Sequence, residues 1–244
     1  MQTLRAVNIS KTYKNGQDTP VLKDVSVSVE EGEVLAIVGP SGSGKSTLMD
    51  ILGLLTMPDD GEIYINDVAP PWHDDKKLSA LRNRSIGFIF QSFHLIPRFT
   101  VLDNVTLPLV YAGIPKSERL AAGLSVLRHL GINHRALYYP TQISGGERQR
   151  TAIARAIITD PSVILADEPT GNLDYAASGV VLDILTDTAH NKGKSVVIVT
   201  HDLDIARKAD RVFELDKRPI TPLFEQSGLN ADKEKGELDD VLVR

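Results

Sequence analysis

Apolar and polar residues alternate along two segments near the amino terminus, residues 4–9 and 21–29. A period of two residues is typical of strands that bury one face, so we predict two half-buried strands of an antiparallel sheet. Residues 63–65 alternate in the same way after a Pro-Asp-Asp-Gly turn and predict a third strand. Between the first two strands, residues 14–18 predict a turn-rich loop.

Short apolar runs of a second kind occur throughout the chain, and they predict strands of a different sheet. A continuous apolar run bounded by glycine or polar residues is typical of a strand buried on both faces, as in a parallel sheet. The predicted buried strands are 34–38, 86–90, 162–168, 195–199 and 211–215.

Helical spacing dominates the middle of the chain. Residues 100–109 and 117–130 repeat apolar positions every three or four residues, and one stripe contains Leu120, Leu124, Leu127 and Leu130. We expect this stripe to pack in a core rather than to form a partner groove. Residues 91–155 are therefore predicted to form a mainly helical lobe inserted between core strands, and residues 73–84 a short surface helix.

Composition narrows the class of protein without identifying its activity. The 244 residues suffice for one large α/β domain or two lobes that share a core. A formal net charge of −5 does not favour nucleic-acid binding, and the chain contains no cysteine for disulfides or thiolate chemistry. The first residues lack the apolar region of a secretory signal, and no apolar stretch approaches 18 residues. We therefore expect a soluble chain that would reach a membrane only through a partner.

The strongest local pattern follows the strand 34–38. Two glycines with four residues between them, Gly39 and Gly44, are followed at once by Lys45 and Ser46. In a phosphate-binding loop, backbone N–H groups surround a phosphate, the lysine neutralises the β and γ phosphates, and the serine hydroxyl ligates Mg²⁺. A simple glycine turn would not explain the lysine and serine. The predicted loop and the start of its helix comprise Gly39, Pro40, Ser41, Gly42, Ser43, Gly44, Lys45, Ser46 and Thr47, with the helix at 47–55.

Two further strand ends carry candidate chemistry. Asp167 and Glu168 end the strand 162–168, where Asp167 can hold Mg²⁺ through water and Glu168 can accept a proton from an attacking water. His201 follows the strand 195–199, at the edge where doubly wound sheets place ligands. The alternative is an acidic loop and a structural histidine, which the nearby phosphate loop disfavours.

A serine and two glycines at a helix start form a second anion-receptive surface. Ser144 is placed as an N-cap, and Glu147 completes a capping box, which by itself is a structural role. The exposed N–H groups of Gly145 and Gly146 could also receive a phosphate. Because the loop ending at Ser46 already provides one phosphate site, this surface suggests closure over a nucleotide bound to another molecule.

Over residues 2–216 the chain resembles the ATP-binding cassette of ABC transporters. The resemblance rests on a series of motifs in this order: the phosphate loop, Gln91, Ser144–Glu147, Asp167–Glu168, residues 171–174 and His201. The resemblance implies an α/β fold: a P-loop NTPase core with a mostly parallel sheet, an antiparallel β subdomain and an inserted helical subdomain. Residues 1–216 would form the ATPase domain, and residues 217–244 a polar carboxyl-terminal tail.

The same resemblance implies roles for single residues. Tyr13 would stack on adenine, and Gln91 would sense Mg²⁺ and the membrane subunit. Ser144 and Gly146 would grip the γ-phosphate of the partner's ATP, and Asp174 would contact the second subunit. Glu168 would be the catalytic base and His201 the γ-phosphate switch. The implied cofactors are ATP and Mg²⁺, and the implied partners are a second copy in an ATP-sandwich dimer and a transmembrane permease subunit at the cytoplasmic face of the membrane.

A narrower resemblance points to the branch that serves macrolide export, lipoprotein release and antimicrobial-peptide export. It rests on residues 91–97, 104–109 and 166–174; Ile143 departs from the usual leucine. A cassette that regulates a membrane-anchored signalling or cell-division complex would have the same catalytic residues, so that alternative stays open. A DNA-repair cassette would need a long coiled coil between Lys45 and Ser144, and a tandem-cassette translation factor would need a second phosphate loop; the sequence has neither.

Overall fold

The computed structural model describes residues 1–14 and 18–215. The predicted loop at 14–18 lies mostly outside these residues, and the predicted tail at 217–244 lies wholly outside them. In chain order the elements are β1 (Gln2–Lys14), β2 (Asp18–Glu30), β3 (Val34–Val38), α1 (Lys45–Leu52), β4 (Asp60–Ile65), α2 (Asp75–Ser85), β5 (Ile86–Phe90), α3 (Val101–Tyr111), α4 (Lys116–His129), η1 (Asn133–Arg135), η2 (Pro140–Gln142), α5 (Gly145–Ile157), β6 (Val163–Asp167), α6 (Tyr175–His190), β7 (Ser195–Val199), α7 (Leu203–Ala206) and β8 (Arg211–Glu214).

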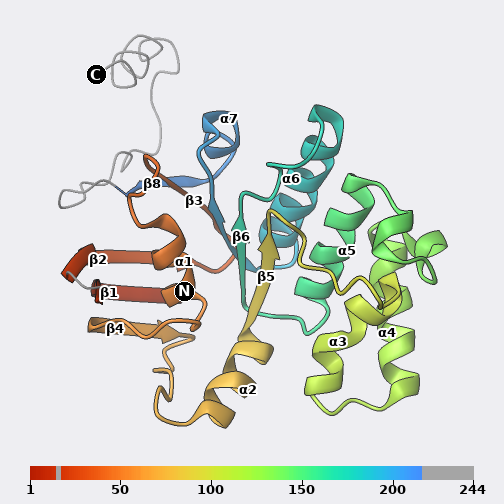
Figure 1. Cartoon of the computed structure of the whole chain (residues 1–244), viewed down its shortest axis with the longest axis horizontal. Helices are drawn as coiled ribbons and strands as arrows, with labels where there is room; N and C mark the ends of the chain where they lie inside the picture. The colour runs from red at the N-terminus through yellow and green to blue at the C-terminus, as the bar shows by residue number, and fades with distance from the viewer. Residues whose placement is uncertain (15–17, 216–244) are drawn as a thin grey trace.

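The amino-terminal strands form an antiparallel sheet in the order β2-β1-β4, which confirms the three alternating strands (Figure 1). Leu4 pairs with Val29 on one side and with Ile65 on the other, and all three side chains are buried. Strands β1 and β2 continue well beyond the alternating segments, because pairing between neighbouring strands extends to Lys14 and Asp18.

The five apolar runs form a second sheet with the order β5-β6-β7-β3-β8, and every neighbouring pair is parallel. All residues of β3 and β7 are buried, as expected for strands covered on both faces. Parallel strands place their carboxyl ends at one edge of the sheet. The loops after β3, β5, β6 and β7 therefore emerge together at that edge.

Side chains of the parallel sheet alternate between two hydrophobic cores. Leu165 and Val197 pack with the antiparallel sheet and α1, whereas Ile164 and Val196 pack with α3, α5 and α6. The parallel sheet thus separates the antiparallel sheet from the helices of the middle segment. Figure 1 shows these two parts on opposite sides, with α3 and α4 farthest from β1, β2 and β4.

Helix α5 joins the helical segment to the parallel sheet. A Cβ atom on Gly87 of β5 would lie 2.4 Å from the carbonyl oxygen of Ala156, so only glycine permits this close packing. Helix α5 also packs against α3. The helices predicted at 73–84, 100–109 and 117–130 are all present, and no helix within residues 1–14 and 18–215 is long and apolar enough to cross a membrane.

Two helical details differ from the sequence prediction. Helix α1 spans Lys45–Leu52 rather than 47–55, because Gly53 passes against the ring of Phe88 and Leu54 adopts a left-handed conformation with φ of 57°. In the predicted leucine stripe, Leu127 is buried but Leu124 is 38% exposed. Helix α4 instead turns Gly123 toward α3, a contact that a search for apolar residues misses.

Candidate functional site

The loop between β3 and α1 brings several backbone N–H groups to the carboxyl edge of the parallel sheet. Gly39 has φ of 153°, and a Cβ there would lie 2.4 Å from the carbonyl oxygen of Leu215, so the turn requires glycine. The Nζ atom of Lys45 donates hydrogen bonds of 2.7 and 2.8 Å to the carbonyls of Gly39 and Pro40. These bonds fold the lysine side chain back over the loop, while the start of α1 has no side-chain cap.

Ser43 lies inside this loop, and its hydroxyl oxygen is buried without a hydrogen-bond partner among the residues described. Buried hydroxyl groups normally have a partner, so this one is a candidate ligand contact. Ser46 is exposed in the first turn of α1, where its hydroxyl remains accessible. The fold therefore brings together Lys45, Ser46 and the loop glycines, as the sequence predicted.

Asp167 and Glu168 lie at the end of β6, beside this loop. The pKa of Asp167 is raised above its usual value, first by burial and then by the negative charges of Glu168 and Asp50, while Lys45 opposes the shift. Asp50 of α1 also has a pKa raised by burial. The site thus holds several carboxylates at an energetic cost, and a cation placed among them would offset that cost.

Glu168 is held by residues that follow β7. Its Oε2 atom accepts a 3.0 Å hydrogen bond from the hydroxyl of Thr200, and its Oε1 atom accepts a 2.9 Å bond from the backbone N–H of His201. The ring atom Nδ1 of His201 lies 2.5 Å from the same Oε1 atom. The backbone of Glu168 has φ of 43°, a left-handed conformation that turns its side chain toward β7. Thr200 was not predicted from the sequence.

Gln91 follows β5 and contacts the loop after β6. The Nδ2 atom of Asn172 donates a 2.8 Å hydrogen bond to the carbonyl oxygen of Gln91. A Cβ on Gly171 would lie 2.6 Å from the side-chain nitrogen of Gln91, so the two loops touch. The segment 91–97 then continues along α5, where the Arg155 guanidinium donates hydrogen bonds of 2.8 and 2.5 Å to the carbonyls of Phe93 and His94.

The segment from Ser144 to Glu147 begins α5 as predicted. The hydroxyl of Ser144 accepts a 3.2 Å hydrogen bond from the N–H of Glu147, and the Glu147 carboxylate accepts a 2.8 Å bond from the N–H of Ser144. This capping box and the nearby Arg135 lower the pKa of Glu147 to about 2. Gly146 packs against Ala177, three residues after Asp174, which caps α6. Ser144 and Asp174 therefore lie on neighbouring helix starts.

Tyr13 lies near the end of β1. Asp59 holds this part of the strand, because its two carboxylate oxygens accept bonds of 2.8 Å from Lys11 Nζ and 2.7 Å from the N–H of Thr12. The Lys11 ammonium lies 5.8 Å from the centre of the Tyr13 ring. Asp59 thus positions the strand next to the tyrosine, a contact that sequence reasoning missed.

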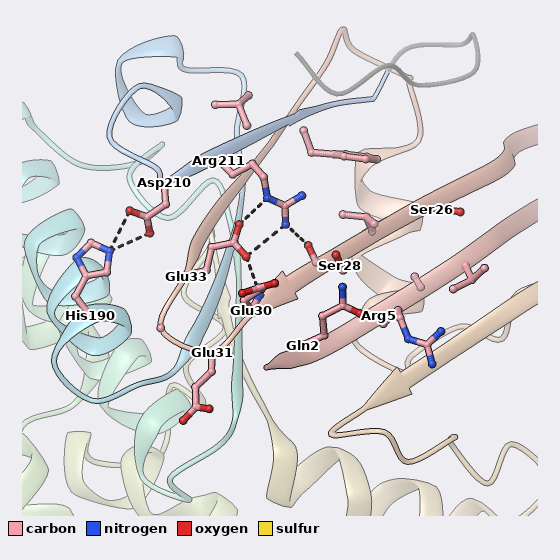
Figure 2. A pocket seen from close by; sticks show the side chains of 16 residues that line it. Gln2, Arg5, Ser26, Ser28, Glu30, Glu31, Glu33, His190, Asp210 and Arg211 are labelled. Carbon is pink, nitrogen blue, oxygen red and sulfur yellow. Dashed lines mark hydrogen bonds and ion pairs between the residues drawn. The ribbon is translucent and has the colours of Figure 1, made fainter. Parts of the chain in front are cut away.

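A pocket of about 730 Å³ lies at the other edge of the parallel sheet, away from these residues (Figure 2). Two pairs of charged side chains line it: Arg211 binds Glu33 at 2.6 Å and also the carbonyl of Ser28, and His190 lies 2.9 Å from Asp210. These pairs join β2 to β8 and α6 to the start of β8. The residues that line this pocket therefore form polar contacts between the two sheets.

A family model described as ABC transporter matches residues 22–171, more than half of the chain. The chain belongs to the ABC transporter family. It is an ATP-binding cassette, an ATPase whose cofactors are ATP and Mg²⁺. The α/β fold expected from the resemblance is confirmed by the two sheets and by the structural comparison below.

The chain is similar in sequence to two bacterial ATP-binding proteins of ABC transporters. The ABC transporter ATP-binding protein YvrO of Bacillus subtilis is 47% identical over 84% of this chain and 89% of that protein. The lipoprotein-releasing system ATP-binding protein LolD of Bordetella pertussis is 45% identical over 90% of this chain and 95% of that protein. A dimeric structure of the ATP-binding cassette MJ0796 with ADP and phosphate has a TM-score of 0.80 at 40% identity, covering 87% of this chain and 94% of that one.

The residues of this cassette fit both cofactors. For the nucleotide, the unpartnered Ser43 hydroxyl and the free N–H groups at the start of α1 suit phosphate oxygens. For the metal, the Asp167 carboxylate and the Ser46 hydroxyl are oxygen donors of the kind that Mg²⁺ prefers. Burial and the charges of Glu168 and Asp50 raise the pKa of Asp167, so a cation beside it would be stabilised. No cluster of three or more His, Cys, Asp or Glu side chains within the described residues could hold a metal by itself. Mg²⁺ commonly binds through one or two carboxylates together with phosphate oxygens and water.

Proposed function

We propose that this cassette powers a membrane permease subunit that extracts or exports a lipoprotein, peptide or drug-like molecule, and that it acts as a head-to-tail dimer at the cytoplasmic face of the membrane. The observation that carries the catalytic part is the set of hydrogen bonds that Thr200 and His201 make to Glu168. The names of the relatives support the transport part, and the dimeric cassette structures support the dimer.

In the proposed hydrolytic step, residues at the carboxyl edge of the parallel sheet have separate roles. Glu168 accepts the proton of the attacking water, and the bonds from Thr200 and His201 fix the direction of its carboxylate. Because a carboxylate only accepts, the Nδ1 atom of His201 carries the hydrogen in this contact. The Nε2 atom of His201 lies on a side chain that is 75% exposed, and it can donate to a γ-phosphate oxygen when it also carries a hydrogen.

The proposed nucleotide contacts use the rest of the site. The N–H groups of the glycine loop and the ammonium of Lys45 bind the phosphates, and Tyr13 stacks on the base. Ser46, Gln91 and Asp167 would hold Mg²⁺, which when bound would supply positive charge next to the phosphates. In the dimer, Ser144, Gly145 and Gly146 of one subunit approach the nucleotide of the other, and Asp174 and Glu147 support that surface.

The segment 91–97 is the proposed docking site for the permease. It joins the parallel sheet to the helical segment, and its carbonyls bind Arg155 of α5, the helix that begins after Ser144. A displacement of segment 91–97 by the permease would therefore be transmitted through α5 to the surface that faces the second nucleotide. The lipoprotein-releasing relatives favour a lipid-modified substrate among the possible cargoes.

The test is reconstitution with the membrane permease subunit that copurifies with this chain. Purified cassette and membrane subunit in vesicles should form a complex whose ATPase activity rises at least severalfold when a lipidated peptide is added. An unmodified peptide of the same sequence is the control. Stimulation by a cell-wall hydrolase instead, with no response to any transported molecule, would favour the regulatory class of cassette and contradict this proposal.

A further inference from the structure

Gln149 lies in the second turn of α5, and its side chain is fully buried. The Nε2 atom donates a 2.6 Å hydrogen bond to the carbonyl oxygen of Pro169. A backbone carbonyl oxygen only accepts hydrogen bonds, so the amide group must present its NH₂ side to Pro169. Gln149 is therefore held in one orientation by a single contact with the loop after β6.

Pro169 is the residue next to Glu168. The turn that they form is closed by a 3.1 Å hydrogen bond from Gly171 to the carbonyl of Glu168, and the N–H of Glu168 is bound to Val199 of β7. Glu168 itself has the left-handed backbone, which ordinary residues adopt only when the surroundings hold them there. Val199 holds one side of this turn, and Gln149 holds the other.

Stability alone does not account for an amide at this position. The Oε1 atom of Gln149 is buried and has no hydrogen-bond partner among residues 1–14 and 18–215. A buried polar atom without a partner destabilises the fold, and an apolar side chain of similar volume would remove that atom. The amide therefore contributes a directed contact with Pro169 that a methionine could not make.

We propose that Gln149 is a positioning residue that holds Glu168 in its catalytic orientation and ties it to helix α5. The inference rests on the proposed role of Glu168 as the base. It adds a link within one chain, because α5 begins at the surface proposed to act on the partner's nucleotide, whereas Glu168 acts on the chain's own nucleotide. Gln149 connects these two half-sites through one side chain.

The test uses Gln149→Met in the full chain, with Thr151→Val as the matched control. Thr151 is buried in the same helix, and its hydroxyl donates a hydrogen bond to the carbonyl of Glu147 in the preceding turn. We expect Gln149→Met to lower kcat at least tenfold, with KM for ATP and the melting temperature close to those of the control. In a Glu168→Gln background, Gln149→Met should still allow the ATP-dependent dimer, measured by light scattering.

Three results would overturn the inference. One is a kcat for Gln149→Met within twofold of the Thr151→Val value while Glu168→Gln is inactive, which would leave the base assignment intact. Another is a loss of kcat matched by a loss of dimer or of folding, repeated with Gln149→Leu, which would give Gln149 a structural role. The third is wild-type turnover in Glu168→Gln, which would remove both the base and its positioning residue.

Discussion

The Nδ1 atom of His201 and the Oε1 atom of Glu168 are 2.5 Å apart, and the backbone N–H of His201 binds the same oxygen. Glu168 directly follows β6, and His201 lies two residues after the end of β7. The last residues of these adjacent strands, Asp167 and Val199, are paired, so the register of the parallel sheet brings the two side chains together. With an ionised Glu168, the Nδ1 atom is the donor in this contact, and the other ring nitrogen belongs to an exposed side chain. The pair therefore links a proposed base to a proposed phosphate contact.

Replacing Asp167 by Asn should stabilise the fold and abolish activity. The folded-state pKa of Asp167 is raised, so at neutral pH its ionised form is disfavoured in the native state. An amide removes that cost, and the gain should shrink as the pH falls and the wild-type carboxyl becomes protonated. Thermal unfolding without nucleotide at pH 7 and pH 4 measures this effect, and a lower melting temperature for the variant at pH 7 would contradict it.

Glu147→Gln should destabilise the protein most at neutral pH. The pKa of Glu147 is lowered to about 2 by the N–H of Ser144 and by Arg135, so its contribution is fully present above about pH 4.5 and is lost as the pH falls toward 2. Urea unfolding should show the difference from wild type narrowing over that range. The exposed Glu118→Gln in the first turn of α4 serves as the control, with little change at either pH. An equal deficit for Glu147→Gln at both ends of the range would argue against this linkage.

Tyr13→Ala should raise KM for ATP roughly tenfold with little change in kcat, because stacking of a base on an aromatic ring contributes about 1–3 kcal/mol. Tyr13→Phe keeps the ring and should behave as wild type. Stacking does not distinguish purines, so GTP should also be hydrolysed. Strict rejection of GTP would mean that polar contacts to the base determine specificity.

Phe93→Asp should weaken binding of the membrane subunit at least tenfold while basal ATPase activity stays within about twofold. Phe93 is only partly buried, and its ring lies 5.2 Å from the Arg148 guanidinium. Leu137→Asp is the matched control, since Leu137 is 77% exposed and lies outside the segment 91–97. Binding to the reconstituted permease measures both variants, and equal binding by the two would exclude this docking site.

Much of the fold could be predicted from the spacing of apolar residues and from the glycine, proline and polar residues that bound each element. Alternation identified the strands that contain Leu4 and Ile65, and continuous apolar runs identified the buried strands such as β3 and β7. The bounds of α1 were wrong because the contact between Gly53 and Phe88 is tertiary and leaves no local signal. Leu124 was placed in the core for a related reason, since Gly123 rather than a leucine faces α3.

Residues of the candidate site could be predicted only where they stand at a fixed distance in the sequence from a glycine or a strand end. Lys45 and Ser46 follow the glycines of the loop directly, and Asp167, Glu168 and His201 end apolar strands. Thr200, Asp59, Arg155 and Gln149 were missed, because each acts through a bond to a residue far away in the sequence. A buried glutamine in a helix has no distinguishing pattern until its partner, Pro169, is known.

In the proposed dimer, Glu168 of one subunit and Ser144 of the other complete each nucleotide site. Glu168→Gln keeps the shape of the side chain and removes the base, so turnover should fall at least a hundredfold while ATP still binds. Size-exclusion chromatography with light scattering should then show Glu168→Gln as a dimer in saturating ATP and Mg²⁺, and as a monomer without ATP. Adding Ser144→Arg should keep it monomeric under the same conditions. A Glu168→Gln protein that remains monomeric in ATP, or a double variant that dimerises equally well, would contradict the account.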